Sequence, residues 1–300
     1  MHTVFAVIVN WNSPQHTISC VNSLRATSAT LTEIVVVDNG SGADSFSYLS
    51  DALGDVQIYR NAENLGYAGG LQTGVDHCLR KNADLIWCLN NDTSFTDTTL
   101  AELISCVERN GMNCIYTPKL LDPVHNNRVL FNGRFFDTAT ANYRNAMPGE
   151  SYRYGKAEFD LISEVVSGAS FLVPADVIRK YGFMTHDYFL YYEEFDYALR
   201  MKEFGVECIC VQSSMMFHTR SGSQGNNPSH FGQVRAYYRT RNKIIFFHRN
   251  FKKMQALRCS AKHILKTLKN LYDEANTDWR IQLLAIWHGL IGKSGKVLIP

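Results

Sequence analysis

The sequence lacks the patterns that mark several large classes of protein. It contains no run of 18 apolar residues, so we expect no membrane-spanning helix. No Cys-x-x-Cys pair occurs among its eight cysteines, and neither a Gly-x-Gly-x-x-Gly turn nor a complete P-loop pattern is present. These absences argue against a cysteine-based zinc site, a dinucleotide dehydrogenase and a P-loop nucleotidase.

Acidic residues are missing from a long stretch near the C-terminus. Between Cys208 and Tyr272 the chain has no Asp or Glu, although the net charge of the whole protein is only +2. The same stretch holds twelve basic residues: Arg220, Arg235, Arg239, Arg241, Lys243, Arg249, Lys252, Lys253, Arg258, Lys262, Lys266 and Lys269. Such a segment favours an anionic partner, for example a diphosphate, an anionic lipid or a nucleic acid. Because no recognisable nucleic-acid-binding module accompanies it, we expect no nucleic-acid partner.

The general composition is that of a globular protein. Of the 300 residues, 45% are hydrophobic and 19% are charged, which allows a large core. The N-terminal residues start an apolar run without the basic segment of a signal peptide. We therefore expect a cytoplasmic protein whose cysteines are reduced and buried. The basic stretch near its C-terminus could contact the inner face of the membrane.

Apolar runs and helical segments alternate in the first third of the chain. Val4–Val9, Glu33–Asp38 and Leu85–Leu89 are typical of strands buried on both faces of a parallel sheet. Helices are expected between and after these strands, at about residues 14–26, 44–53, 67–81 and 98–109. The alternation predicts an open, doubly wound α/β sheet.

Polar residues follow each of the three strands. They are Asn10 and Asn12 after the first strand, Asp38 and Asn39 after the second, and Asn90, Asn91 and Asp92 after the third. Ligands of open α/β sheets bind outside the carboxyl ends of the strands, so these residues are expected to outline one site. Asp92, with Asn90 as a weaker neighbour, could bind Mg²⁺ or Mn²⁺ while a diphosphate supplies further oxygens. Both Asp38 and Asp92 also fit ordinary turns.

A glycine-rich turn precedes the helix expected at 67–81. It runs from Asn64 through Gly66, Gly69 and Gly70 to Gly74. Glycines at a helix start allow a ligand or another backbone to approach closely. Close packing of the helix against the sheet explains them equally well.

Later motifs add titratable and basic groups. Glu193 and Glu194 begin a predicted helix after an aromatic run. An apolar wall formed by these aromatic residues would raise the pKa of a carboxyl group and make it a better general base. The helix dipole alone also explains acidic residues at a helix start. His218 follows a strand expected at Val206–Val211, and a lone histidine is more often structural than a ligand. Arg239 and Arg241 lie two apart on a predicted helix and suit diphosphate oxygens.

The chain is expected to divide near residue 228. Residues 1–228 would form the catalytic α/β domain, and 229–300 a basic helical region. Within the latter, the apolar residues Ile264, Leu265, Leu268, Leu271 and Tyr272 share one face of an amphipathic helix. That face either packs on the catalytic domain or lies on an anionic membrane surface.

Taken in order, these motifs resemble those of the family 2 glycosyltransferases, most closely the rhamnosyltransferase-like branch that builds bacterial surface polysaccharides. The matching runs cover about residues 4–245: Val7–Asn12, Val36–Ser41, Asn61 with Asn64–Gly70, Leu89–Thr93, Ser167–Leu172, Phe189–Asp196, His218 with Ser221 and Ser223, and Arg241-Asn242. Each run is short, but their shared order makes the resemblance specific.

The resemblance implies a nucleotide-diphospho-sugar transferase fold of the GT-A type, an open mostly parallel sheet flanked by helices, and inversion at the anomeric carbon. It places Asp38 on the nucleotide base, with Asn10 and Asn12 nearby. It places the metal at Asp92, with Asn90 in the first position of the family's D-x-D motif and His218 as a further contact. The second member of the Glu193-Glu194 pair would be the general base. The donor site would also include Asn39, Asn64, Gly66, Gly69, Gly70, Asn91, Arg239 and Arg241.

Two departures from the family pattern matter. Asn90 replaces the first aspartate of D-x-D, and Glu194 stands where the base is usually Asp. We therefore expect an inverting, metal-dependent hexosyltransferase that moves a sugar, for example rhamnose, from a nucleotide-diphosphate donor to a glycan or lipid-linked glycan. The alternative is a non-catalytic protein that binds nucleotide sugars or carbohydrate on the same fold.

Overall fold

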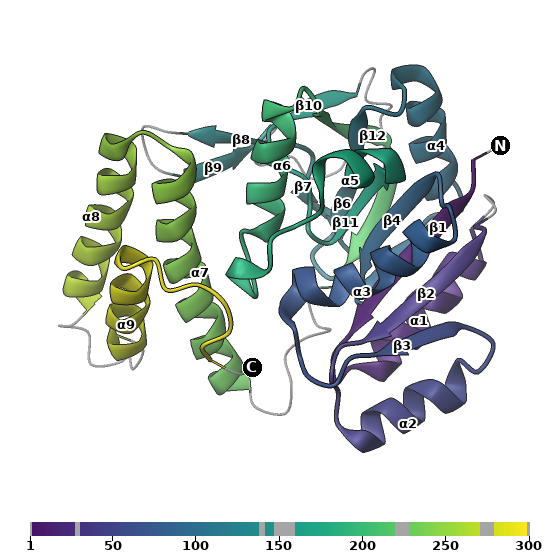
Figure 1. Cartoon of the computed structure of the whole chain (residues 1–300), viewed down its shortest axis with the longest axis horizontal. Coiled ribbons are helices and arrows are strands. Elements are labelled where there is room, and N and C mark those ends of the chain that lie inside the picture. Colours follow the sequence, from purple (N-terminus) through teal and green to yellow (C-terminus); the bar gives the residue numbers. More distant parts are fainter. Residues whose placement is uncertain are drawn as a thin grey trace.

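The computed structural model describes residues 2–27, 31–137, 142–146, 160–219, 228–270 and 279–298. Among these residues, one ten-stranded sheet is flanked by helices, and a group of C-terminal helices lies to one side of it (Figure 1). The sequence motifs at Ser221 and Ser223, Arg220, and the apolar residues Leu271 and Tyr272 lie outside the described ranges.

The N-terminal half of the sheet is parallel, as predicted. Strands β1 (Val4–Asn10), β2 (Glu33–Asp38) and β4 (Leu85–Asn90) coincide with the three apolar runs, and β3 (Gln57–Arg60) lies at the edge. Their order is β3-β2-β1-β4, so β2 and β3 lie on one side of β1 and β4 lies on the other. The register pairs Asn10 with Asp38 and Val9 with Asn90, which brings the polar strand ends to one level.

Helices cover both faces of this sheet and produce two cores. On one face, α3 (Gly66–Arg80), α5 (Ala175–Tyr181) and α6 (Glu193–Glu203) pack on residues such as Val7 and Val35. On the other, α1 (Pro14–Arg25), α2 (Ala43–Ala52) and α4 (Thr99–Asn110) pack on residues such as Ala6 and Val36. Successive strand residues therefore serve opposite cores, which explains why the runs are apolar throughout.

The rest of the sheet is mixed. Strand β11 (Ser170–Pro174) is antiparallel to β4, and beyond it lie β6 (Cys114–Asp122), β12 (Glu207–His218) and β10 (Leu161–Ser163). The short strands β5 (Thr93–Phe95) and β7 (Arg128–Phe131) pair with β12 and β6, while β8 (Arg134–Asp137) and β9 (Asn142–Asn145) form a separate hairpin. The strand expected at 165–173 begins only at Ser170, because the amide of Ser170 closes a turn on the carbonyl of Ser167.

Three helices form the described C-terminal part: α7 (Pro228–Asn250), α8 (Lys253–Asn270) and α9 (Trp279–Leu290). Helix α8 buries Ala256, Cys259 and Thr267, whereas Leu265 and Leu268 of the predicted apolar face are 66% and 45% exposed. The prediction that this face packs on the catalytic domain is therefore wrong for these two leucines. Of the helices in the described ranges, none has the length and apolar character needed to cross a membrane. All eight cysteines are free and buried, as expected.

Candidate functional site

The ends of β1 and β2 are joined by a buried polar network. Asn10 is fully buried, and its Nδ2 donates to Oδ1 of Asp38 at 2.9 Å. The hydroxyl of Thr17 in turn donates to Oδ1 of Asn10 at 2.8 Å. Both ends of this amide are used inside the protein, so Asn10 lies beside Asp38, as expected, and positions its carboxylate. Its contact with a donor stays a prediction.

Asp38 is also fully buried. Its Oδ2 accepts from the backbone N–H of Ser41 at 3.3 Å and lies 3.6 Å from Nε of Arg60. The Arg60 side chain is 44% exposed and its guanidinium lies over the Phe46 ring, 4.1 Å from the centroid. Arg60, which the sequence did not single out, is thus a cation next to the Asp38 carboxylate.

The remaining amides at these strand ends shape the loops. Oδ1 of Asn12 accepts from the N–H of Gly42 at 2.9 Å, and Asn12 itself has a left-handed backbone with a φ of 49°. Nδ2 of Asn39 donates to the carbonyl of Gly66 at 2.9 Å, while its Oδ1 accepts from Nδ2 of Asn61 at 3.0 Å. Oδ1 of Asn64 accepts from the N–H of Gly66 at 2.9 Å. These contacts hold the loop before α3 against the end of β2.

The glycines of α3 are explained by close packing. Gly66 has a φ of +77°, and a Cβ there would lie 2.2 Å from the carbonyl oxygen of Phe189. A Cβ on Gly70 or Gly74 would lie 2.8 or 2.4 Å from a methyl group of β1, and one on Gly69 would lie 2.7 Å from Cβ of Leu65. The N–H of Tyr67 donates to the same Phe189 carbonyl at 2.9 Å. Of the two interpretations of this motif, the structure supports packing, since protein atoms occupy the space that a ligand would need.

Asp92 and His218 meet at the carboxyl end of the sheet. Antiparallel pairing of β5 with β12 places His218 beside Thr93, and Nε2 of His218 lies 3.0 Å from Oδ1 of Asp92. The N–H and hydroxyl of Thr219 both donate to the carbonyl of Asp92, at 3.1 and 3.2 Å. The two side chains are thus held together although 126 positions separate them in the sequence.

This pair fits a divalent cation. Two neighbouring ligands of an octahedral Mg²⁺ or Mn²⁺ lie about 3.0 Å apart when each bond is about 2.1 Å, which is the spacing of the Asp92 and His218 atoms. Within the described part of the chain, no group of three or more His, Cys, Asp or Glu residues is arranged to hold a metal. Protein side chains of those types would therefore supply two ligands at most here.

The two asparagines of the same turn differ in environment. Asn91 is buried, and its Nδ2 donates to the hydroxyl of Thr17 at 3.0 Å and to the carbonyl of Ser13 at 3.3 Å. Its amide nitrogen is thus engaged with α1 and the residue before it, and its place in the donor site stays a prediction. Asn90 is half-buried, and its carbonyl accepts from the hydroxyl of Thr93 at 2.7 Å. Both residues stabilise the turn that carries Asp92.

The paired glutamates begin α6, as predicted, and their environments differ. Glu193 is 3% exposed, and within the described residues its Oε2 has no hydrogen-bond partner. Burial and the adjacent Glu194 raise the pKa of Glu193 well above its usual range. Burial raises the pKa of Glu194 to about 7, although the positive charges of Arg134 and Arg239 oppose this shift. The pKa of Glu194 thus lies near neutral pH, where the carboxyl is poised to exchange a proton, whereas Glu193 holds its proton more strongly than a free carboxyl does.

Tyr67 connects the glutamates to the metal pair. Its hydroxyl donates to the carbonyl of Gly168, and a Cβ at Gly168 would lie 3.5 Å from the Glu194 carboxyl. Burial raises the pKa of Tyr67 well above its usual range, and the negative charges of Glu193, Glu194 and Asp92 add to this shift. The Tyr67 hydroxyl therefore lies in the electrostatic field of all three carboxyls.

A strained turn positions the two glutamates. Phe189, Tyr191 and Tyr192 have φ values of 64°, 69° and 79°, a conformation that costs about 1–2 kcal/mol for each such residue. Nδ2 of Asn242, on α7, lies 2.7–2.9 Å from the carbonyl oxygens of Tyr188, Leu190 and Tyr191. The turn is therefore stabilised by a residue far along the chain.

Arg241 supports the same turn and is not available to a diphosphate. It is fully buried, and its three nitrogens donate to Oδ1 of Asn242 and to the carbonyls of Gly295 and Tyr188, at 2.7–2.9 Å. In this arrangement its guanidinium binds protein oxygens, and its contact with the donor stays a prediction. Arg239 is exposed and near the ring of Tyr191, so of the two predicted arginines it alone faces the site.

We expect Asn242→Ala to lower the free energy of unfolding by about 3 kcal/mol, because it leaves buried carbonyls without a donor on a strained turn. If the turn shifts α6, the activity of the folded variant should fall by about a hundredfold. Urea unfolding and a transferase assay measure the two effects. The matched control is Asn250→Ala on the same helix, whose exposed amide bonds Phe246 and Asp196, and it should change each value only slightly.

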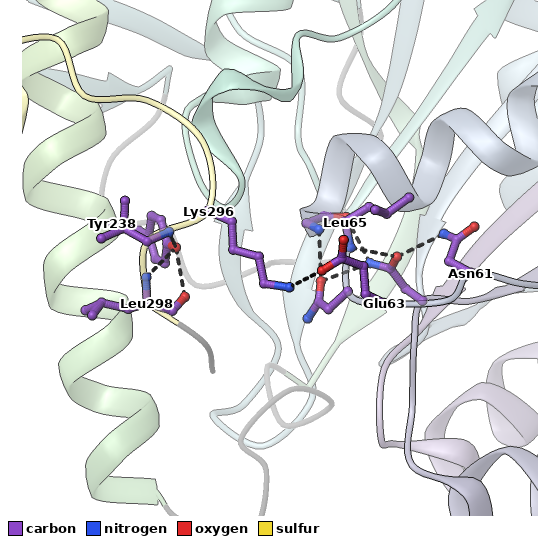
Figure 2. A network of polar contacts seen from close by, with 10 residues as sticks. Asn61, Glu63, Leu65, Tyr238, Lys296 and Leu298 are labelled. Carbon is purple, nitrogen blue, oxygen red and sulfur yellow. Dashed lines mark hydrogen bonds and ion pairs between the residues drawn. The ribbon is translucent and has the colours of Figure 1, made fainter.

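The C-terminal segment joins α9 to the loop before α3. Figure 2 shows Lys296 extending to Glu63, with an Nζ to Oε2 distance of 2.8 Å. The hydroxyl of Tyr238 donates to the carbonyl of Leu298 at 2.8 Å and accepts from the backbone N–H of Val297. Lys296 and Glu63 are partly exposed, so their ion pair contributes little alone, and Tyr238 is the firmer anchor of this segment.

Comparison with known proteins points to one family. The model described as glycosyl transferase family 2 matches residues 5–170. The low-salt glycan biosynthesis hexosyltransferase Agl10 of Haloferax volcanii is 23% identical over 201 residues, which span 65% of this chain and 60% of that protein. The dTDP-rhamnosyl transferase RfbF of Shigella flexneri is 24% identical over 258 residues, 82% of this chain and 80% of that one.

A solved structure shares the fold. The mannosyltransferase PcManGT from Pyrobaculum calidifontis, in complex with GDP-Man and Mn²⁺, has a TM-score of 0.60 over 96% of this chain and 87% of its own. At 12% sequence identity the likeness concerns the fold, and it bears out the GT-A type architecture with C-terminal helices.

Proposed function

Because the chain belongs to glycosyl transferase family 2 and is therefore a glycosyltransferase, we propose that it transfers a sugar with inversion from a nucleotide-diphosphate donor, using Glu194 as the base. One observation carries this proposal: the turn at Gly168 and Ala169 contacts both ends of the site. The N–H of Asn90, in the turn that carries Asp92, donates to the carbonyl of Ala169 at 3.0 Å, and the Glu194 carboxyl lies beside Gly168. A site for the departing diphosphate thus adjoins a base for the attacking hydroxyl.

Glu194 has the properties that a single displacement requires. With a pKa of about 7 it accepts a proton near neutral pH, and the residue as a whole is only half-buried. As the acceptor oxygen attacks the anomeric carbon, Glu194 would take its proton while the bond to the diphosphate breaks on the opposite face. Glu193 is buried and its pKa is raised by that burial, so we assign the base to its more exposed neighbour.

Asp92 and His218 would hold the divalent cation, as their 3.0 Å spacing supports. When bound, such an ion neutralises charge on the leaving diphosphate. Because the turn offers one carboxylate, the diphosphate itself would complete the coordination shell, and the solved relative with Mn²⁺ favours such use of metal. Arg239 is placed to add positive charge near the site.

A deoxythymidine-diphosphate rhamnose donor is favoured by the similarity to RfbF, with a uridine-diphosphate sugar as the nearest competitor. The acceptor would be a glycan or lipid-linked glycan. The test is release of nucleoside diphosphate from a panel of such donors with candidate acceptors and Mn²⁺. Donor binding without release would instead favour the alternative, a non-catalytic binding protein.

We also propose that α8 and α9 contact an anionic membrane surface. Both helices expose large apolar side chains: Met254, Leu257, Leu265 and Leu268 on α8, and Leu283, Leu284, Trp287 and Leu290 on α9. The two helices contain Arg258, Lys262 and Lys266 but no acidic residue. Apolar side chains beside cations suit the interface of an anionic bilayer.

In flotation assays we expect binding to vesicles with phosphatidylserine, and its loss in high salt or with neutral vesicles. The double variant Leu265→Ser and Trp287→Ser should bind about tenfold more weakly, because it removes apolar area from both helices. Val124→Ser, a similarly exposed apolar position outside these helices, serves as the control. Equal binding to neutral and anionic vesicles would contradict the proposal.

A further inference from the structure

A basic pocket opens between β7 and the β8–β9 hairpin. It has a volume of about 220 Å³ and is lined by Arg128, Val129, Leu130, Arg134, Tyr143 and Asn145. Among the residues that the structure describes, this lining, called the hairpin pocket below, contains two guanidinium groups and no carboxylate. Its charge favours an anionic ligand.

Arg134 is oriented in advance. Its Nε donates to Oδ1 of Asn145 at 3.0 Å, and its Nη2 donates to the carbonyl of Leu130 at 3.3 Å. The guanidinium lies over the Tyr143 ring, 4.8 Å from the centroid. Because its rotamer is already selected by these contacts, Arg134 would lose little conformational entropy on facing an oxyanion.

Arg128 contributes an exposed guanidinium to the same lining. Asp122 lies opposite Arg128 in the β6–β7 ladder, but its carboxylate accepts from Nδ1 of His125 at 2.9 Å and from the N–H of Val124 at 3.0 Å. Across the part of the chain that the structure describes, no carboxylate comes within 4.0 Å of the Arg128 guanidinium. Its charge is therefore available to a ligand.

The hairpin pocket lies beside the base. Arg134 and Phe136 are two apart on β8, so they share a face, and Phe136 packs on Phe195 with ring centroids 5.8 Å apart. Phe195 directly follows Glu194, whose carboxyl feels the positive charge of Arg134. An acceptor whose hydroxyl reaches Glu194 could thus place a second group in the pocket.

We propose that the hairpin pocket binds an anionic group of the acceptor through Arg128 and Arg134. This inference rests on the proposed function, which places the acceptor hydroxyl at Glu194. The ligand would be a phosphate, diphosphate or carboxylate attached to the sugar that is glycosylated. The pair at Asp92 and His218 is reserved for the diphosphate of the donor, so the two anions would bind separately.

The first test measures binding without catalysis. Inorganic phosphate is titrated in the presence of EDTA and followed by ³¹P NMR, for the wild type, Arg128→Ala and the control Arg144→Ala. Arg144 is an exposed arginine on β9 outside the lining. We expect Arg128→Ala to bind about tenfold more weakly than the other two proteins, since it loses a charge-assisted contact. Equal affinities in all three, or equal losses in both variants, would overturn the proposal.

The second test measures the KM for three acceptors that carry the same neutral glycan. In the first the glycan is attached to a lipid diphosphate, in the second it is an alkyl glycoside with an added uronic acid, and in the third it is a plain alkyl glycoside. Arg128→Ala should raise the acceptor KM about tenfold for at least one anionic acceptor, with the donor KM and the plain glycoside unaffected. The anionic acceptor whose KM rises identifies the source of the anion, a diphosphate or a carboxylate. If the KM rises for neither anionic acceptor, or if the donor KM changes instead, the proposal fails. Failure of the proposed function would appear separately, as no nucleoside diphosphate release by the wild type.

Discussion

Replacing Glu194 with Gln is expected to lower kcat by about 10²–10⁴-fold, because the amide cannot accept the proton of the acceptor hydroxyl. The donor KM should stay near the wild-type value, since Glu194 lies on the acceptor side of the reaction. Steady-state release of nucleoside diphosphate measures both parameters. For the wild type, kcat should rise with pH through about 7 and level off above it, as the Glu194 carboxyl ionises.

Glu193→Gln is the matched control for this variant. Glu193 is buried and burial raises its pKa, so its neutral form is favoured and an amide is a close replacement for it. We expect its kcat to remain within about tenfold of the wild type. A large loss in Glu193→Gln with near-normal Glu194→Gln would reverse the two roles. Glu194→Asp should keep part of the activity, because it retains a carboxylate one methylene further back.

Loss of folding does not explain the expected defect of Glu194→Gln. The pKa of Glu194 is raised in the folded protein, so the unfolded chain binds fewer protons between about pH 4.5 and 7. The contribution of this group to stability therefore falls as the pH rises through that window and is constant above it. Removing the charge should leave the Tm at pH 8 unchanged or higher, and a thermal melt checks this.

Asp92→Ala is expected to lower kcat/KM by about 10²–10³-fold, because the leaving diphosphate loses the carboxylate that would anchor its cation. Asp92 is the only acidic residue of its turn, so no neighbouring aspartate replaces it. Titration of activity with Mn²⁺ should show a much weaker metal dependence in the variant. His218→Ala should show the same effect with a smaller magnitude.

Asp51→Ala serves as the control for this series, since Asp51 is an exposed carboxylate on α2. It should match the wild type in kcat/KM and in its response to Mn²⁺. Near-normal activity of Asp92→Ala, with an unchanged Mn²⁺ titration, would contradict a cation site at Asp92 and His218.

Much of the fold could be predicted because the signals were local. Strand β2 has the predicted bounds, and helices such as α3 and α4 begin and end within about two residues of them. Strand β3 is short and half-exposed, so no apolar run marked it. The β8–β9 hairpin depends on packing against α6, and nothing in its own sequence reveals that contact.

The site was predicted less completely, because a polar residue at a strand end can bind either a ligand or the protein. Asn10, Asn91 and Arg241 looked like donor contacts, but their partners are Asp38, α1 and the turn at 188–192. Those partners lie up to 74 positions away in the chain, so the sequence could not distinguish the two roles. Arg60 and Arg134 were missed for the same reason.

The most direct test of the account is a thermal-shift panel of nucleotide sugars with and without Mn²⁺, on the wild type, Asp92→Ala and Glu194→Gln. The account predicts that one nucleotide class raises the Tm of the wild type and of Glu194→Gln only when Mn²⁺ is present, and leaves Asp92→Ala unchanged. Stabilisation that is independent of Mn²⁺ and equal in Asp92→Ala, or its absence with every donor, would contradict a metal-held donor at Asp92 and His218.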